Sequence, residues 1–86
     1  MQSIRTATCR ELPVLWIGIS DLDGTLRFEV VDKDLEALFK LFRDPEETAV
    51  ITRIYDEDEK TFTGFTVFRG IEATGHATTV IHLSKR

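Results

Sequence analysis

Only one stretch of the 86-residue sequence has apolar side chains at helical spacing, and the other apolar stretches alternate as β-strands do. The helical period begins at Asp32, and Pro45 requires the helix to end by about Arg43, because residues preceding a proline avoid the α-helical region. The predicted apolar stripe consists of Leu35, Leu38, Phe39 and Phe42, flanked by Leu41. The sequence therefore predicts one amphipathic helix of about three turns, with Asp32 or Asp34 as its cap.

Two β-rich segments, 14–20 and 25–31, flank an Asp23-Gly24 pair, which is a strong signal for a β-hairpin. A tight turn of this kind favours a positive φ at Gly24. The segments therefore predict a hairpin that ends at this turn.

The register of this hairpin can be predicted, because a slip of one residue would place apolar groups opposite charged ones. A four-residue loop, 21–24, pairs Ile19 with Leu26 and keeps the loop aspartates in water. A three-residue loop would instead place Ile19 opposite Arg27, and a two-residue loop would turn Asp21 toward the apolar side. We therefore expect the four-residue loop, which also pairs Ile17 with Phe28.

Alternation returns after the helix in segments 48–55, 61–69 and 77–83, and a weaker pattern covers 3–9. The connections between the last three segments are short and polar, as in an antiparallel meander. We expect one domain, residues 1–86, with an α+β fold. In this fold an antiparallel sheet, made of a hairpin and a three-stranded meander, packs one face against the amphipathic helix.

The Asp-x-Asp-Gly-Thr sequence at 21–25 resembles the opening motif of haloacid dehalogenase-like phosphohydrolases. In that chemistry Asp21 would be the nucleophile and Asp23 the general acid/base, with Mg²⁺ beside the phosphate. The fold needs a helix directly after the first strand, whereas here a second strand pattern follows. We therefore interpret the motif as a turn.

Other arrangements of reactive side chains do not fit known sites either. An EF-hand loop with Gly24 at position 6 would place Ile19 and Val30 at ligand positions. His76 and His82 have no cysteine partners at zinc-binding spacing, and Cys9 is the only cysteine. We expect no metal, no cofactor and no enzymatic activity.

The formal net charge of −4 argues against nucleic acid as a partner, because phosphate backbones are bound by basic surfaces. No apolar run approaches the ~20 residues that span a bilayer, and the N-terminus lacks the apolar segment of a signal peptide. We expect a cytoplasmic protein with no membrane or nucleic-acid partner.

Residues 34–71 resemble a pattern in small prophage proteins encoded near tail genes of Gram-positive bacteria. There a helix of the form L-x-x-L-F leads into an Asp-Pro-x-x-Thr turn, an alternating strand and an aromatic strand. The matching residues are Leu35, Leu38, Phe39, Asp44, Pro45, Thr48, Ile51, Phe65 and Thr66. The resemblance implies a role in assembly, with a virion location possible, and it transfers no catalytic residue. The chain lacks the long C-terminal helical extension of that pattern.

Segment 61–69 carries large apolar groups on both alternating faces, with Phe62 and Phe68 on one and Phe65 on the other. One helix can cover only one face, so we expect Phe62 and Phe68 to bind a partner, either another protein or a second copy of this chain. In the alternative, the N-terminal strand or hairpin covers this face and closes a barrel or sandwich. The expected function is a small non-enzymatic binding or assembly module. The alternative function is regulatory or inhibitory docking on a cellular partner by shape and negative charge.

Overall fold

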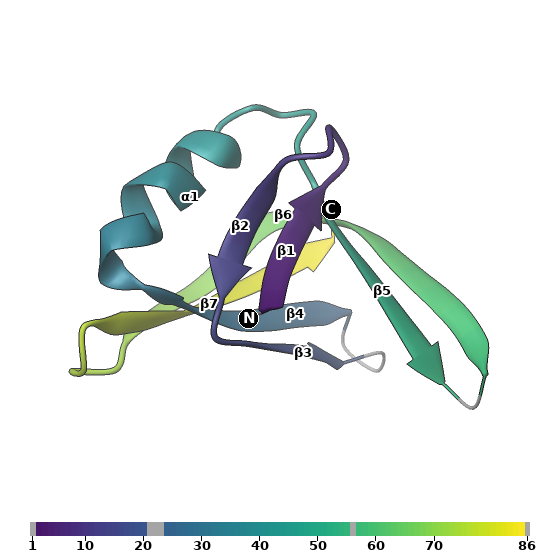
Figure 1. Cartoon of the computed structure of the whole chain (residues 1–86). Helices are drawn as coiled ribbons and strands as arrows, with labels where there is room; N and C mark the ends of the chain where they lie inside the picture. Colours follow the sequence, from purple (N-terminus) through teal and green to yellow (C-terminus); the bar gives the residue numbers. More distant parts are fainter. Residues whose placement is uncertain (1, 21–23, 56, 86) are drawn as a thin grey trace.

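A computed structural model describes residues 2–20, 24–55 and 57–85 (Figure 1). This part of the chain forms seven strands, one 3₁₀ turn and one short helix. Their bounds are β1 Gln2–Thr6, β2 Glu11–Val14, β3 Trp16–Ser20, β4 Thr25–Val31, η1 Asp32–Asp34, α1 Leu35–Leu41, β5 Ala49–Tyr55, β6 Asp58–Ala73 and β7 Thr78–Lys85. The fold is therefore mostly β, more so than the α+β class that the sequence predicted.

The strands form one antiparallel sheet in the order β2-β1-β5-β6-β7-β4-β3. Its two edge strands, β2 and β3, are separated in sequence by Leu15 alone, so the sheet curls until its edges meet at this residue (Figure 1). The Leu15 amide donates a hydrogen bond of 2.8 Å to the carbonyl of Glu29 at the junction. Buried side chains of the β1–β2 hairpin belong to the same core cluster as those of the remaining strands.

The β3–β4 hairpin has the predicted register. Ile19 stands opposite Leu26 and Ile17 opposite Phe28, and Gly24 has a φ of +65°. Alternation then places Leu26 and Phe28 in the core, where both are fully buried. The interpretation of the Asp-x-Asp-Gly-Thr motif as a turn concerns Asp21 and Asp23, and both lie outside the described residues.

Helix α1 lies beside the curved sheet (Figure 1). Its side chains Leu38 and Leu41, and Phe42 directly after it, are buried in the core cluster. The buried stripe is rotated relative to the prediction, so that Phe39 lies at its exposed edge. Neither predicted cap makes a side-chain cap bond. Asp32 instead accepts a hydrogen bond of 2.6 Å from the hydroxyl of Thr79, which ties the start of the helical segment to β7.

Strand β6 departs from strict alternation, and this changes which residues face the core. Phe62 and Phe65 stand opposite Ile51 and Ala49, which are two residues apart on β5 and share one face. Register irregularities on this strand, with Gly64 at a φ of +89°, allow the three-residue spacing. The expectation that Phe62 and Phe65 face opposite sides was therefore wrong, and both are buried in one core.

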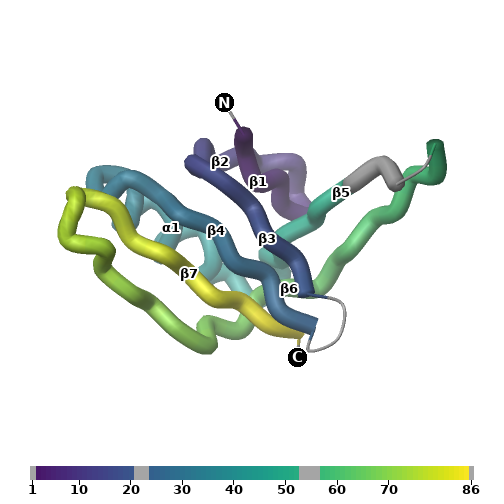
Figure 2. Tube along the Cα trace, turned by 90° about the horizontal axis from the view of Figure 1, so that it is seen from below, coloured from purple at the N-terminus to yellow at the C-terminus, as the bar shows by residue number. Residues whose placement is uncertain are grey.

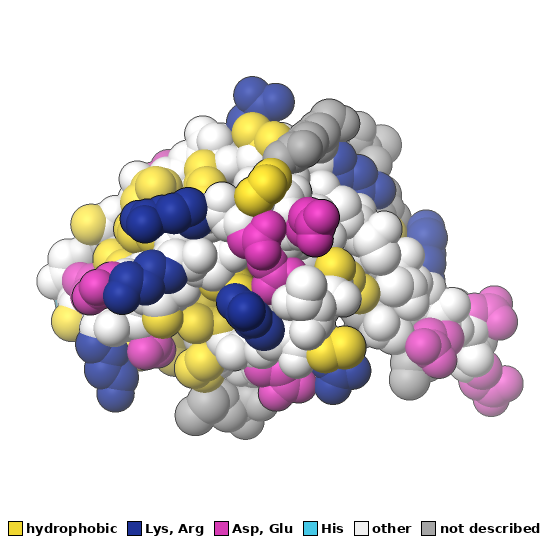
Figure 3. Space-filling view, turned by 90° about the horizontal axis from the view of Figure 1, so that it is seen from above, with side chains coloured by type: hydrophobic (Ala, Val, Ile, Leu, Met, Phe, Trp, Pro, Cys, Tyr) yellow, Lys and Arg dark blue, Asp and Glu magenta, His cyan; other side chains and the backbone are white. Residues whose placement is uncertain are grey.

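The outer parts of β5 and β6 form a two-stranded arm. Strand β1 pairs only with residues 49–50 of β5, and β7 pairs with β6 only from Phe65 onward. The arm therefore extends beyond the rest of the sheet, as Figure 2 shows. Exposed Glu57, Asp58 and Glu59 lie at its tip, where acidic side chains gather in Figure 3.

Glu47 joins the β1–β2 turn to the segment that precedes β5, although its side chain is completely buried. Its carboxylate accepts hydrogen bonds from the hydroxyls of Thr6, at 3.0 Å, and Thr8, at 2.7 Å. Its backbone carbonyl accepts a third from Thr66 at 3.0 Å. Buried carboxylates are costly unless hydrogen-bonded, so this network holds the β1–β2 turn against the segment that precedes β5.

No helix in the described part of the chain is long and apolar enough to cross a membrane.

Candidate functional site

The bend between β2 and β3 exposes two neighbouring apolar side chains. Leu15 is 51% exposed and Trp16 is 38% exposed. Trp16 stands opposite Glu29 on β4, and its indole nitrogen donates a hydrogen bond of 2.8 Å to the carboxylate of Glu29. This bond restricts the indole to one orientation while leaving part of the ring open to solvent.

The Glu29 carboxylate is suited to hold the indole because its surroundings favour its charged form. A hydrogen bond from the Thr78 hydroxyl, and then the one from Trp16, hold the pKa of Glu29 below its ordinary value. The His76 side chain lowers the pKa further, whereas desolvation opposes the shift. At neutral pH the bond from the indole is therefore charge-assisted.

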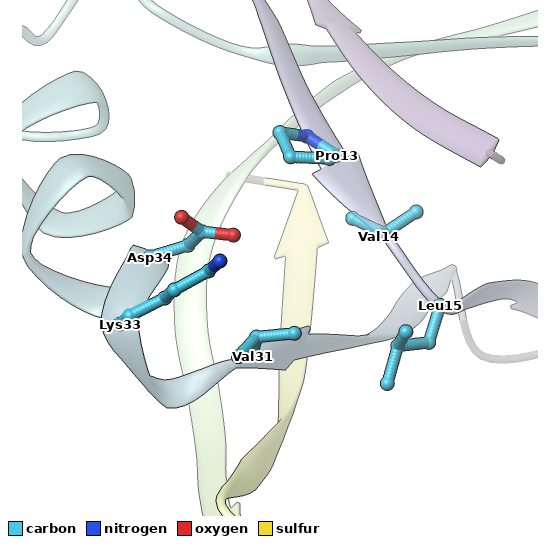
Figure 4. Close-up of a pocket in the computed structure, with 6 residues that line it drawn as sticks. All are labelled: Pro13, Val14, Leu15, Val31, Lys33 and Asp34. Atoms are coloured by element: carbon cyan, nitrogen blue, oxygen red, sulfur yellow. The ribbon is translucent and has the colours of Figure 1, made fainter.

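A cleft of about 250 Å³ opens beside Leu15, between the end of β2 and the corner where β4 meets η1 (Figure 4). Figure 4 shows Lys33 and Asp34 extending toward the opening from the helical side, opposite Pro13. The lining residues are Pro13, Val14, Leu15, Val31, Lys33 and Asp34. Four of these are apolar, so the cleft is suited to an apolar group with a polar edge. We call Trp16 and these six residues the Leu15 corner.

The two residues that the sequence indicated for partner binding lie elsewhere. Phe62 is only 8% exposed and stands opposite Ile51 in the arm. Phe68 is partly buried under the helix, where its ring makes edge contacts with Phe39 and Phe42 at centroid distances of 5.7 and 6.0 Å. Phe62 belongs to the half of β6 that pairs with β5 and Phe68 to the half that pairs with β7. Their role in partner binding stays a prediction.

A second exposed apolar group lies beside Phe68. Phe39 is exposed on the helix, and Ile71, on the same face of β6 as Phe68, is 52% exposed. Ile71 is not among the residues that line the cleft beside Leu15. Ile71 is therefore a matched control for Leu15, equal in exposure but without the cleft.

The cysteine and the two histidines, which could serve as metal ligands or reactive groups, lie in different parts of the fold. Cys9 is exposed in the β1–β2 turn, His76 lies in the β6–β7 turn and His82 lies on β7. Within residues 2–20, 24–55 and 57–85, no three His, Cys, Asp or Glu side chains are grouped as metal ligands. The predictions of no metal and no enzymatic activity remain predictions.

Comparison with protein-family models, curated proteins and solved structures found no match to this chain. The resemblance of residues 34–71 to prophage tail-region proteins therefore stays a prediction.

Proposed function

We propose that this chain is a small non-enzymatic binding module that contacts a protein partner through the Leu15 corner. The observation that carries this proposal is the exposed Leu15–Trp16 pair beside an apolar cleft. Adjacent large apolar side chains on the surface of a small domain usually mark a contact surface. The resemblance of residues 34–71 to prophage tail-region proteins supports an assembly role for this contact.

The bond between Trp16 and Glu29 gives the proposed surface a fixed shape before binding. A side chain that is already held loses little conformational freedom when a partner covers it, and tryptophan dominates many interfaces. The neighbouring cleft can accept one apolar side chain of the partner, with Lys33 and Asp34 available for polar groups around it. The proposed interface thus has an aromatic anchor, a cleft and a polar rim.

Affinity capture with paired variants tests this function. The wild type, Leu15→Ser and Ile71→Ser are compared as baits in native cell extract, and each captured protein is then purified and titrated against all three. We expect a partner whose affinity falls at least about tenfold for Leu15→Ser, the size of an interface anchor, and less than about twofold for Ile71→Ser. Equal binding by the three proteins would contradict the proposal.

A second candidate function, regulatory docking by negative charge, is favoured by the acidic tip of the arm. Glu57, Asp58 and Glu59 are exposed there, and Figure 1 shows the outer end of β5 away from the junction of β2 and β3. This function requires partner affinity to fall when Asp58→Lys and Glu59→Lys are combined, and to weaken with increasing salt. Binding through the Leu15 corner instead depends little on either change.

A further inference from the structure

The outward face of β4, β7 and β6 concentrates basic side chains, although the whole chain is acidic. Arg27 stands opposite His82, and His82 stands opposite Gly70, so one row crosses three strands. Arg69, in the irregular part of β6, donates a hydrogen bond of 2.8 Å from its Nε to the Ser84 hydroxyl. The arginines come from separate strands and line one depression.

This depression has a volume of about 330 Å³. Its lining residues are Ser20, Thr25, Arg27, Arg69, Gly70, Glu72 and His82. Gly70 has no side chain, and this leaves room for His82. A Cβ at position 70 would approach Cδ2 of His82 to 3.2 Å. Glycine at this position thus allows the imidazole to lie across β6.

Two polar groups in the depression are poorly matched by the protein itself. No side-chain hydrogen bond or ion pair among the described residues involves the Arg27 guanidinium. The Nε2 atom of His82 is buried without a hydrogen-bond partner, and the closest carboxylate oxygen, from Glu72, is 4.0 Å away. Two guanidinium groups that share one depression also repel each other unless an anion lies between them. These features make the depression suited to an anion.

We infer that the depression binds the phosphate group of a small phosphate monoester. Guanidinium groups bind phosphate oxygens through paired hydrogen bonds, and Arg69 lines the depression while its Nε is held by Ser84. The lining hydroxyls of Ser20 and Thr25 add further polar groups around the space. A phosphate group has more acceptor oxygens than a carboxylate. It can therefore accept hydrogen bonds from donors on several strands at once. The expectation that nucleic acid is not a partner was based on net charge, which averages over the surface and does not exclude a local site for one phosphate group.

Among the described residues that line the depression, Glu72 is the only acid, so it competes with the anion. Its carboxylate is largely exposed, and one of its oxygens lies 4.0 Å from Nε2 of His82. Removing its charge should therefore strengthen phosphate binding, whereas removing an arginine should weaken it. Both effects follow from local charge, so the chloride probe and an arginine variant outside the depression are needed to separate a phosphate site from general electrostatic attraction.

The test is an NMR titration of the ¹⁵N-labelled full chain at pH 7 and constant ionic strength, with inorganic phosphate, phenyl phosphate and chloride as probes. We expect saturable shifts around the depression for both phosphates and none for chloride. Arg27→Gln and Arg69→Gln should each raise Kd at least about fivefold, the loss expected for one charge-assisted hydrogen bond. Glu72→Gln should lower Kd at least about twofold.

Arg10→Gln, which removes an exposed arginine in the β1–β2 turn, is the matched control and should change Kd by less than about twofold. An equal loss in Arg10→Gln, or shifts that chloride reproduces, would overturn the proposal. Binding of inorganic phosphate without phenyl phosphate would overturn the monoester assignment. Each variant's amide spectrum reports its fold, and Arg69→Gln decides the question if Arg27→Gln does not fold.

Discussion

The Trp16 indole and the Glu29 carboxylate are joined by a 2.8 Å hydrogen bond across the β3–β4 pair. The same carboxylate also accepts a hydrogen bond from Thr78 on β7. The ionised side chain of Glu29, on β4, thus binds both the exposed indole on β3 and the Thr78 hydroxyl on β7. This relationship makes the orientation of Trp16 dependent on the charge of Glu29.

Because the folded state lowers the pKa of Glu29, its contribution to stability is present above the ordinary pKa and is lost as pH falls through the lowered value. Thr78→Val removes the largest cause of this shift. We therefore predict that the gap in free energy of unfolding between the wild type and Thr78→Val shrinks as pH falls from about 5 to about 3. Urea unfolding at several pH values measures it, and a gap independent of pH would contradict the prediction.

Replacing Gly24 with valine should destabilise the protein through backbone strain alone. Gly24 has a φ of +65°, and a Cβ built there meets no atom within 4 Å. We predict that Gly24→Val lowers the free energy of unfolding by about 1–3 kcal/mol. Gly24→Asn is the control, because asparagine tolerates this conformation, and it should cost less than about 1 kcal/mol. Equal denaturant midpoints for both variants would argue against strain.

The buried bond between Thr6 and Glu47 should appear as an energetic coupling. We predict that Thr6→Val and Glu47→Gln each lower the free energy of unfolding by about 1–2 kcal/mol, because each leaves buried polar groups poorly paired. The double variant should cost less than the sum by about 1 kcal/mol, since both changes remove the same bond. Thr52→Val, at an exposed threonine pair, should change stability by less than about 0.5 kcal/mol. Strict additivity in the Thr6–Glu47 cycle would contradict the network.

The irregular register of β6 predicts a clear order among phenylalanine truncations. Phe62→Ala should lower the free energy of unfolding by about 3–5 kcal/mol, because the ring is buried against the core. Phe39→Ala, at an exposed ring, should cost less than about 1.5 kcal/mol, near the value of one aromatic edge contact. Chemical denaturation of both variants measures this order. If Phe39→Ala cost as much as Phe62→Ala, the assignment of Phe62 to the core would be wrong.

Much of the local structure could be predicted where one physical constraint dominates. The hairpin register followed from keeping Ile19 opposite Leu26, and the helix from its apolar period and Pro45. No strand was predicted at residues 11–13, where Pro13 lacks an amide for strand pairing, yet β2 is an edge strand, in which a missing amide is tolerated. The faces of β6 were misassigned because irregularities that depend on tertiary pairing do not appear in an alternating pattern.

The candidate site was harder to predict because it arises where the chain changes direction. Segment 14–20 looked like one strand, whereas the structure divides it at Leu15. Four successive apolar residues, 14–17, were the available signal, since a half-buried strand alternates apolar with polar side chains. The basic depression was hidden for another reason. Arg27, Arg69 and His82 are far apart in sequence and meet only through strand pairing.

Site-specific photo-cross-linking tests the central claim, binding through the Leu15 corner, most directly. A photoreactive phenylalanine analogue is placed at position 15 or, as a control, at position 71, because the two side chains are 51% and 52% exposed. The protein is irradiated in its native cells, and the cross-linked products are identified by mass spectrometry. The account predicts one defined protein adduct from position 15 and none of that adduct from position 71. The same adducts from both positions, or none from position 15, would contradict it.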